Sequence, residues 1–309
     1  MENARTLLLE TLTSFAGREE KQRILFLSPG ADISAPPSLP PEIIALTASK
    51  NVIESKYLIA ISIKLLKENG ALLIAADNKE NGKRLENWRT ELGLVGTSFI
   101  GHKARCILVT DISTVRRDVL EEWEQAGQIQ KNSAGFYSQP GLFSWDRIDP
   151  ASRLLSDSLT QNASLAGKGA DFGCGYGYLS HYLLHHHPGI TSLTAIDVDP
   201  RALTCLQKNL ETFGPILHPL LVDLGLLWQQ DQTFDFIVMN PPFHEGRKTL
   251  TSLGISFIRN AAAHLRKGGD LWMVANAHLP YEEPLRELFP EVRQVVQKHG
   301  FKVIHARGR

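Results

Sequence analysis

The stretch Phe234-Asp-Phe-Ile-Val-Met-Asn-Pro-Pro-Phe243 joins a buried strand to a polar end and decides the fold. Its apolar run predicts a strand inside a sheet, which the two prolines end. In an open α/β sheet, ligands bind at the carboxyl ends of the strands. There the Asn240 side-chain oxygen and the Pro241 carbonyl offer two acceptors to a planar exocyclic NH2 group, and Phe243 offers a ring for stacking. An ordinary strand-ending turn is the alternative, because Asn-Pro and Pro-Pro are common in turns.

Acids close three predicted strands that precede this one. The strands end at Asp171, at Asp197 and, for a strand over about 216–222, at Asp223. Acids or an amide at the ends of four successive strands are difficult to explain by turn chemistry alone. Asp197 is placed to accept from both ribose hydroxyls of a nucleoside, and Asp223 from an adenine amino group. A turn acid remains the alternative for Asp223.

A glycine-rich segment, Phe172-Gly-Cys-Gly-Tyr-Gly177, follows the first of these acids and leads into a predicted helix. Gly173, Gly175 and Gly177 let the backbone pass close to a ligand at the helix N-terminus. A dinucleotide fingerprint requires glycine where this chain has Tyr178, which disfavours an NAD-dependent dehydrogenase. Asp171 favours a positively charged ligand over a pyrophosphate. S-adenosylmethionine, a sulfonium nucleoside, fits both features.

The composition predicts a soluble, cytoplasmic protein of two domains. The 309 residues include 33 Lys and Arg against 33 Asp and Glu, with 17 of each sign in residues 1–135 and 16 of each in 136–309. Neither half is a polycation, so nucleic-acid contacts must come from local patches. The three cysteines have neither metal-ligand spacing nor a disulfide framework, and the N-terminus has no long apolar segment. We therefore expect no metal site, signal peptide or membrane span.

Residues 1–135 alternate strands and helices, which predicts a parallel sheet covered by helices. The expected helices are 4–16, 56–68, 80–92 and 114–126, and the expected strands are 23–27, 43–47, 71–75 and 104–109. Only Gly30 follows the first strand, and Asn-Pro-Pro is absent, so this domain is expected to lack a cofactor site. Lys103 and Arg105 are candidate RNA contacts, with ordinary solvated surface as the alternative.

The segment from Gly141 to Pro150 connects the two domains, the second of which is expected to span 136–309. It is aromatic and apolar, and it matches neither a strand nor a helix. One interpretation is a lid over the pocket with Phe143 and Ser144 turned inward. A structural crossover packed on the sheet edge is the other. Asp149 is expected to cap a helix over about 151–160, and Asp199 is expected to cap a later helix that has Pro200 in its first turn.

With these residues placed, the C-terminal half resembles class I S-adenosylmethionine-dependent methyltransferases. The whole chain resembles the two-domain bacterial guanine-N2-methyltransferases of small-subunit ribosomal RNA. The resemblance is carried by Gly141-Leu-Phe-Ser144, Asp149, Asp171 to Gly177, Asn240-Pro-Pro-Phe-His-Glu-Gly246, Val274 to Tyr281 and Phe301-Lys-Val-Ile304. It implies two Rossmann-like methyltransferase domains in tandem, the first degenerate and the second a seven-stranded mixed sheet with a closing hairpin. The family pattern differs at Trp145 and Arg147, where a charged residue and a glycine are usual.

The resemblance implies methyl transfer to the exocyclic N2 of a guanine in 16S ribosomal RNA, within the small subunit or an assembly intermediate, by a monomer. It places the catalytic role on Asn240, Pro241, Pro242 and Phe243, and cofactor roles on Asp171, Gly173, Gly175, Asp197 and Asp223. We assign Gly177, Phe143 and Ser144 to the cofactor as well. Substrate binding is assigned to Phe243, His244, Asp149, Lys103 and Arg105. The alternatives are an adenine-N6-methyltransferase of ribosomal RNA, a glutamine-N5 protein methyltransferase, which usually has Tyr at position 243, and a non-catalytic RNA-binding or assembly module.

Overall fold

The computed structural model describes residues 1–16, 23–31, 37–242 and 247–309, with side chains from Ser252 onward in the last range. The chain forms two units, residues 1–129 with 139–141 and residues 130–138 with 142–309, which we call the N-terminal and C-terminal domains. The boundary expected after residue 135 falls inside a small hairpin, β6 (Gln130–Lys131) and β7 (Tyr137–Ser138). This hairpin belongs to the C-terminal domain, because the Asn209 side chain binds the backbone N–H and carbonyl of Tyr137.

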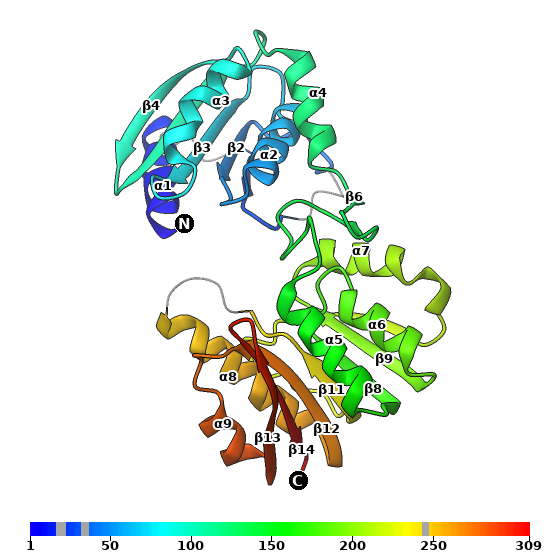
Figure 1. The fold of residues 1–309 in the computed structure, drawn as a ribbon. Helices are drawn as coiled ribbons and strands as arrows, with labels where there is room; N and C mark the ends of the chain where they lie inside the picture. Colours follow the sequence, from blue (N-terminus) through cyan, green and yellow to red (C-terminus); the bar gives the residue numbers. More distant parts are fainter. Residues whose placement is uncertain (17–22, 32–36, 243–246) are drawn as a thin grey trace. The chain divides into compact units, whose positions relative to one another are not determined.

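The C-terminal domain contains a seven-stranded sheet of order β10-β9-β8-β11-β12-β14-β13 (Figure 1). The first five strands in this order are parallel, and β14 and β13 add an antiparallel hairpin. The fold predicted from the sequence for this half is therefore confirmed. The strands are β8 (Ala166–Phe172), β9 (Gly189–Asp197), β10 (Leu217–Leu221), β11 (Phe234–Met239), β12 (Leu265–Asn276), β13 (Glu291–Lys298) and β14 (Phe301–Arg307).

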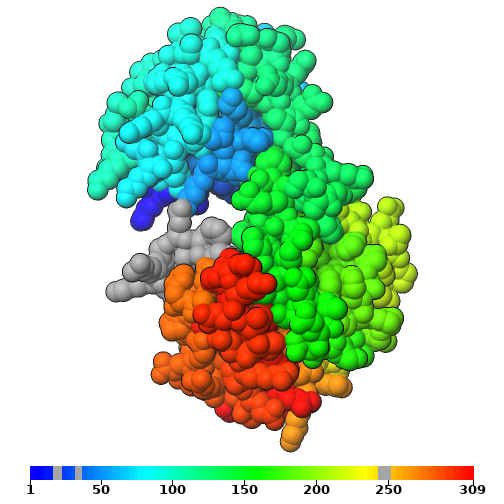
Figure 2. All heavy atoms as spheres, viewed as in Figure 1, coloured from blue at the N-terminus to red at the C-terminus, as the bar shows by residue number. Residues whose placement is uncertain are grey.

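Helices cover both faces of this sheet. On one face lie α5 (Pro150–Asn162), α6 (Tyr178–His186) and α7 (Pro200–Asn209), and on the other α8 (Arg247–His264) and α9 (Glu282–Leu288). Strand β11 supplies both cores, since Phe236 and Val238 pack under the first group while Ile237 and Met239 pack under the second. Full burial on both faces explains the apolar run from Phe236 to Met239. Figure 2 shows the surface of the closing hairpin (red) next to that of α5 (green).

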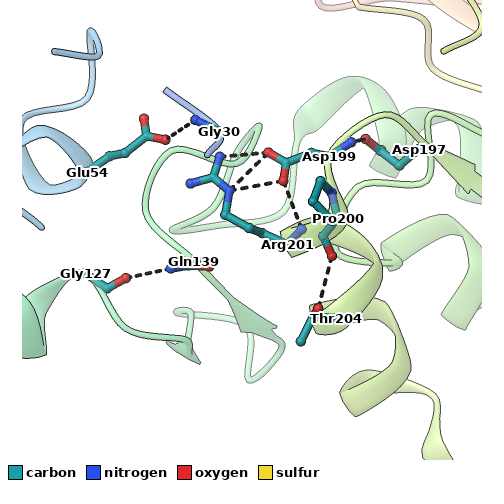
Figure 3. A network of polar contacts seen from close by, with 9 residues as sticks. All are labelled: Gly30, Glu54, Gly127, Gln139, Asp197, Asp199, Pro200, Arg201 and Thr204. Carbon is teal, nitrogen blue, oxygen red and sulfur yellow. Dashed lines mark hydrogen bonds and ion pairs between the residues drawn. The ribbon is translucent and has the colours of Figure 1, made fainter. Parts of the chain in front are cut away.

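Aspartates begin two of these helices. Asp149 precedes α5 and accepts from the backbone N–H of Ser152, and Asp199 precedes α7 and accepts from that of Arg201 (Figure 3). A proline follows each aspartate at the first helical position, where its missing N–H costs no hydrogen bond. Both caps were expected from the sequence and are confirmed. Among the described residues, no helix has the length and hydropathy that a membrane span requires.

The described residues of the N-terminal domain form a five-stranded sheet in the order β1-β2-β3-β5-β4. Strands β1 (Ile24–Leu27), β2 (Ile43–Thr47) and β3 (Ala71–Asp77) are parallel, but β5 (Ala104–Asp111) runs antiparallel to β3 and to β4 (Val95–Gly101). The expectation of a parallel sheet is therefore wrong for this edge, and β4 was missed. The reason is a tight hairpin, in which His102 and Lys103 both have positive φ, as a two-residue turn of type I′ requires.

Helices flank this sheet unequally. The apolar face of α1 (Glu2–Ala16) covers one side, while α2 (Val52–Leu65), α3 (Leu85–Glu91) and α4 (Arg117–Ala126) cover the other. A short 3₁₀ helix over Gly82–Arg84 leads into α3. Two polar contacts of this domain appear in Figure 3, where Glu54 accepts from the Gly30 N–H and Gln139 donates to the Gly127 carbonyl. In each domain the first three strands of the main sheet are therefore parallel and adjacent. In the N-terminal domain the next two strands, β4 and β5, form an antiparallel hairpin that pairs with β3.

Candidate active site

A cavity of about 210 Å³ opens at the carboxyl edge of the C-terminal sheet. The ends of β8, β9, β10 and β11 line it, together with the segment before α5 and part of α8. It brings together eight residues that the sequence singled out, which are Phe143, Gly173, Gly175, Asp197, Asp223, Asn240, Pro241 and Pro242. The four strand ends therefore meet at one place, as their parallel arrangement requires.

Other residues assigned from the sequence lie elsewhere. Asp171, Gly177, Ser144 and Asp149 do not line the cavity within the described part of the chain. Lys103 and Arg105 belong to the N-terminal domain, where Lys103 occupies the β4–β5 turn. Phe243 and His244 lie outside the described residues. Direct contacts from Asp171 or Gly177 to a ligand in this cavity thus have no support from the geometry.

The glycine loop is shaped by three positive φ angles, +75° at Gly173, +54° at Gly175 and +95° at Gly177. The backbone N–H of Gly175 donates to Oδ2 of Asp197 at 2.8 Å, and Oδ1 of Asp197 accepts from the N–H of Asp199 at 3.0 Å. A Cβ at Gly177 would lie 2.6 Å from Cδ1 of Leu206, so glycine there allows the loop to pack against α7. A Cβ at Gly175 would meet no atom within 4 Å, which leaves space on the cavity side.

Asp171 lies beneath this loop, fully buried. Its Oδ2 accepts from the Ser180 hydroxyl at 2.6 Å, whereas Oδ1 is without a hydrogen-bond partner among the described residues. Burial raises the pKa of Asp171 to about 7, and the nearby charge of Asp197 adds to the shift. Burial also raises the pKa of Asp197, against the N–H donors that favour its charged form. Two carboxyl groups below the loop therefore favour a cation above it.

The charge of the cavity lining is consistent with such a ligand. Its described lining residues include Asp197 and the exposed Asp223, and none of them is Lys or Arg. A phosphate or pyrophosphate would need cations or a fan of free N–H groups there. The described residues also contain no group of three or more His, Cys, Asp or Glu side chains that could hold a metal ion. A cavity that is lined by acids and by glycines without a side chain therefore suits a positively charged nucleoside.

Asn240 follows the last residue of β11, and its side-chain amide contacts the start of α5. Its Nδ2 donates to Oδ2 of Asp149 at 3.0 Å and to Oγ of Ser152 at 2.9 Å. Its Oδ1 is buried and is without a partner among the described residues. Asn240 is a lining residue of the cavity, and a buried polar atom without a partner is a candidate to receive a hydrogen bond from a ligand.

Sequence reasoning missed several residues that complete the site. Leu253 and Phe257 of α8 line the cavity, but apolar residues at helical spacing look the same in any core. Asn260 is fully buried and donates to the Leu224 and Leu226 carbonyls while accepting from the Trp228 N–H, so it holds the loop after Asp223. Asn260 stands between Arg259 and Ala261 in the sequence, and no motif around it marks it as part of the site.

Comparisons with known proteins agree with this geometry. Residues 133–305 match the family model described as methyltransferase small domain. The ribosomal RNA small subunit methyltransferase C of Shewanella amazonensis is 30% identical over 256 residues, which are 80% of this chain and 72% of that protein. The Escherichia coli O1:K1 protein of the same name is 38% identical over 167 residues, 54% of this chain and 47% of its own.

Among solved structures, a T. thermophilus 16S rRNA N2 G1207 methyltransferase in complex with AdoMet and guanosine has the same fold. It is 24% identical with a TM-score of 0.72, and the match covers 87% of this chain and 73% of that one. The strand order, the glycine loop after β8 and the Asn-Pro-Pro turn after β11 define a class I S-adenosylmethionine-dependent methyltransferase. The chain belongs to the ribosomal RNA small subunit methyltransferase C family.

Proposed function

We propose that the C-terminal domain transfers a methyl group from S-adenosylmethionine to the exocyclic N2 of a guanine in 16S ribosomal RNA. The observation that carries this proposal is the buried, unpartnered Oδ1 of Asn240 in the cavity beside the glycine loop. An oxygen acceptor there matches an amine donor and does not match a carbonyl or phosphate. The names of the relatives and the guanosine bound to the T. thermophilus protein support guanine as the base.

The residues of the cavity fit the nucleoside cofactor. Gly173 and Gly175 would lie under it, and Asp197 and Asp223 would accept from its hydroxyl and amino groups. The open space at Gly175 and the raised pKa of the half-buried Asp197 are the features that favour this ligand. When bound, S-adenosylmethionine supplies an electrophilic methyl group on a positively charged sulfur. The neighbouring carboxyl groups lower the free energy of that charge in a partly desolvated site.

Asn240 and Pro241 would hold the amine that is methylated. An aryl amine is a weak nucleophile, because its lone pair is delocalised into the ring. Hydrogen bonds from its two N–H groups to Oδ1 of Asn240 and to the Pro241 carbonyl would favour a pyramidal nitrogen with its lone pair exposed. Positioning would supply much of the rate, since the nitrogen must lie in line with the bond that breaks. As the N–C bond forms, the nitrogen becomes more acidic and loses a proton to water, so no strong base is needed.

The N-terminal domain would contribute substrate recognition. Lys103 is exposed in the β4–β5 turn, and Arg105 lies in the adjoining strand, so both could approach an RNA backbone. The net charge of the chain is zero, which leaves such local cations as the means of binding a polyanion. We propose the small ribosomal subunit or an assembly intermediate as the substrate and a monomer as the active form.

The experiment that tests the activity uses labelled S-adenosylmethionine with small subunits and, separately, with free 16S RNA, followed by mass spectrometry of the digested nucleosides. The expected product is N2-methylguanosine. N6-methyladenosine would favour the adenine-N6 alternative, because the same two acceptors can receive that amine. Subunit binding without any labelled RNA would overturn the catalytic proposal in favour of a binding module.

A further inference from the structure

The amide nitrogen of Asn240 is held by two side chains at the start of α5. Asp149 and Ser152 each accept a hydrogen bond from Nδ2, at 3.0 Å and 2.9 Å. We call Asp149 and Ser152 the amide clamp. The same carboxylate oxygen of Asp149 also accepts from the backbone N–H of Ser152 at 2.8 Å, so the helix cap and the amide clamp share one atom. Asp149 and Ser152 are each 8% exposed, which shields the clamp from water.

This arrangement determines which end of the amide faces the cavity. A carboxylate can only accept hydrogen bonds, so a flipped amide would place two acceptor oxygens against each other. The flipped form would also present NH2 to the cavity, where it would repel an incoming amine and suit a carbonyl instead. In the observed orientation the buried Oδ1 is the group that is left for the substrate.

We propose that Asp149 and Ser152 are positioning residues that act on methyl transfer through Asn240, by keeping its oxygen turned toward the amine. The proposal rests on the proposed function. It replaces the sequence-based assignment of Asp149 to direct substrate binding, since Asp149 does not line the cavity within the described residues. It also adds Ser152, one helical turn after the cap, which no sequence motif identified. The clamp thereby contributes to the choice of an amine over a carbonyl edge of the base.

Substitutions can separate the clamp from the cap. Asp149→Ser keeps a good N-cap for α5 but is too short to reach the amide of Asn240. We expect its single-turnover rate at saturating RNA to fall about 10-fold, as is usual when a group that orients a functional residue is removed. Cofactor affinity should stay within about 2-fold. Ser152→Ala should lower the rate about 5-fold, the value of one hydrogen bond. Asn51→Ser, which likewise puts serine at a helix N-cap, that of α2, is the control and should keep the wild-type rate.

A double-mutant cycle tests whether the effect passes through Asn240. In the Asn240→Ala background, Asp149→Ser should cause no further loss of rate, because the group on which it acts is gone. Independent losses that multiply in the double variant would overturn the proposal and return Asp149 to direct substrate contact. The cycle follows label transferred to RNA, whichever base receives it. A product other than N2-methylguanosine would therefore contradict the proposed function, and the double-mutant cycle would still test the role of Asp149.

A second measurement does not depend on activity. The side-chain NH2 signals of Asn240, assigned by their loss in Asn240→Ala, should exchange slowly with solvent in the cofactor-free wild-type protein. In Asp149→Ser we expect exchange to be about 10-fold faster, since one strong charge-assisted acceptor is lost. Unchanged exchange would show that the clamp does not hold the amide. This result would sink the inference even if the enzyme methylates guanine as proposed.

Discussion

The two domains place polar side chains at the carboxyl ends of their parallel strands and use them differently. In the N-terminal domain Asp77 ends β3, and its Oδ1 accepts from the backbone N–H of Ala4 at the start of α1. In the C-terminal domain Asn240 follows β11, and its Oδ1 meets no partner among the described residues. The chemistry of the two acceptors is similar. The difference teaches that a strand-end acceptor is structural where the fold supplies its donor and available to a ligand where it does not.

The two domains also differ in where a cavity lies relative to their parallel strands. A cavity of about 840 Å³ in the N-terminal domain is lined by the end of α2, the end of β5 and the start of α4. Because β5 runs antiparallel to β3, with Val109 opposite Leu72, this cavity lies at the amino edge of the parallel strands. The smaller cavity of the C-terminal domain lies at the carboxyl edge, next to the glycine loop. Position relative to the strands identifies the site, and volume does not.

The largest expected effect comes from exchanging one asparagine in each domain for alanine. Asn240→Ala should lower the rate of methyl transfer about 100- to 1,000-fold, as for loss of a transition-state hydrogen bond, with cofactor affinity retained. Asn81→Ala should instead lower the free energy of unfolding by about 1–3 kcal/mol, because it removes the two hydrogen bonds that the Asn81 side chain donates to the Ser49 and Lys50 carbonyls. Single-turnover rates and urea denaturation measure the pair. Equal turnover in Asn240→Ala would remove the distinction between the domains.

The next effect concerns the buried Asp171. Its pKa is raised from 3.8 to about 7 in the folded protein, so the folded state binds more protons than the unfolded state between about pH 4 and 7. Stability contributed by this group is therefore present at low pH and lost as the pH rises through 7. Between pH 5 and 8 the free energy of unfolding of the cofactor-free wild-type protein should fall by on the order of 2–4 kcal/mol because of this group, and Asp171→Asn should not show that decrease. Urea denaturation at both pH values tests it, and parallel curves for the two proteins would contradict it.

Alanine substitutions at two glycines can distinguish the cost of backbone strain from a direct effect on cofactor binding. Gly175 and Gly135 both have positive φ, and a Cβ at either would meet no atom within 4 Å. Alanine should cost each about 1 kcal/mol of stability. Only Gly175→Ala should weaken S-adenosylmethionine binding, by about 10-fold, because its methyl group would enter the cavity. Calorimetric titration measures the affinities. Equal affinities for the two variants would place the cofactor away from this loop.

The smallest expected effect tests the role of the N-terminal domain. Lys103→Ala should weaken binding to 16S RNA about 3-fold and reduce the slope of log affinity against log salt by about 1, as for one lost phosphate contact. Lys67→Ala is the matched control, since Lys67 lies at the other end of the sheet and pairs with Glu42. Filter binding at several salt concentrations measures both. Identical slopes for Lys103→Ala and wild type would leave this turn without a role in binding.

Prediction from the sequence was good where short-range chemistry decides the structure. The caps Asp149 and Asp199 were identified, because an aspartate followed by proline starts a helix within one turn. The strand β4 was missed, because Val95 and most of its neighbours are exposed and give no apolar run. The antiparallel edge was missed for a related reason, since the turn His102-Lys103 lacks the Asn-Gly or Asp-Gly pair that is typical of a type I′ turn.

The candidate site divides along the same line. The glycine turn, Asp197 and Asp223 at the strand ends and the Asn-Pro-Pro turn could be placed from the sequence, because each depends on a few adjacent residues. Asp171 could not be placed, since the same acid could face a ligand or, as observed, the Ser180 hydroxyl beneath the loop. Phe257 could not be separated from an ordinary core residue, because helical spacing does not tell which apolar side chains border a cavity.

By itself, the sequence determined the alternation of strands and helices, the glycine turn and the residues at the strand ends, since hydrophobic period, φ preference and capping act over neighbouring positions. Only the tertiary structure decided which atoms remain available. Asp149 and Ser152 orient Asn240 from 91 and 88 residues away, and Ala4 satisfies Asp77 from 73 residues away. Whether an acceptor keeps a free oxygen depends on such distant partners, and pairing over that separation leaves no local pattern in the chain.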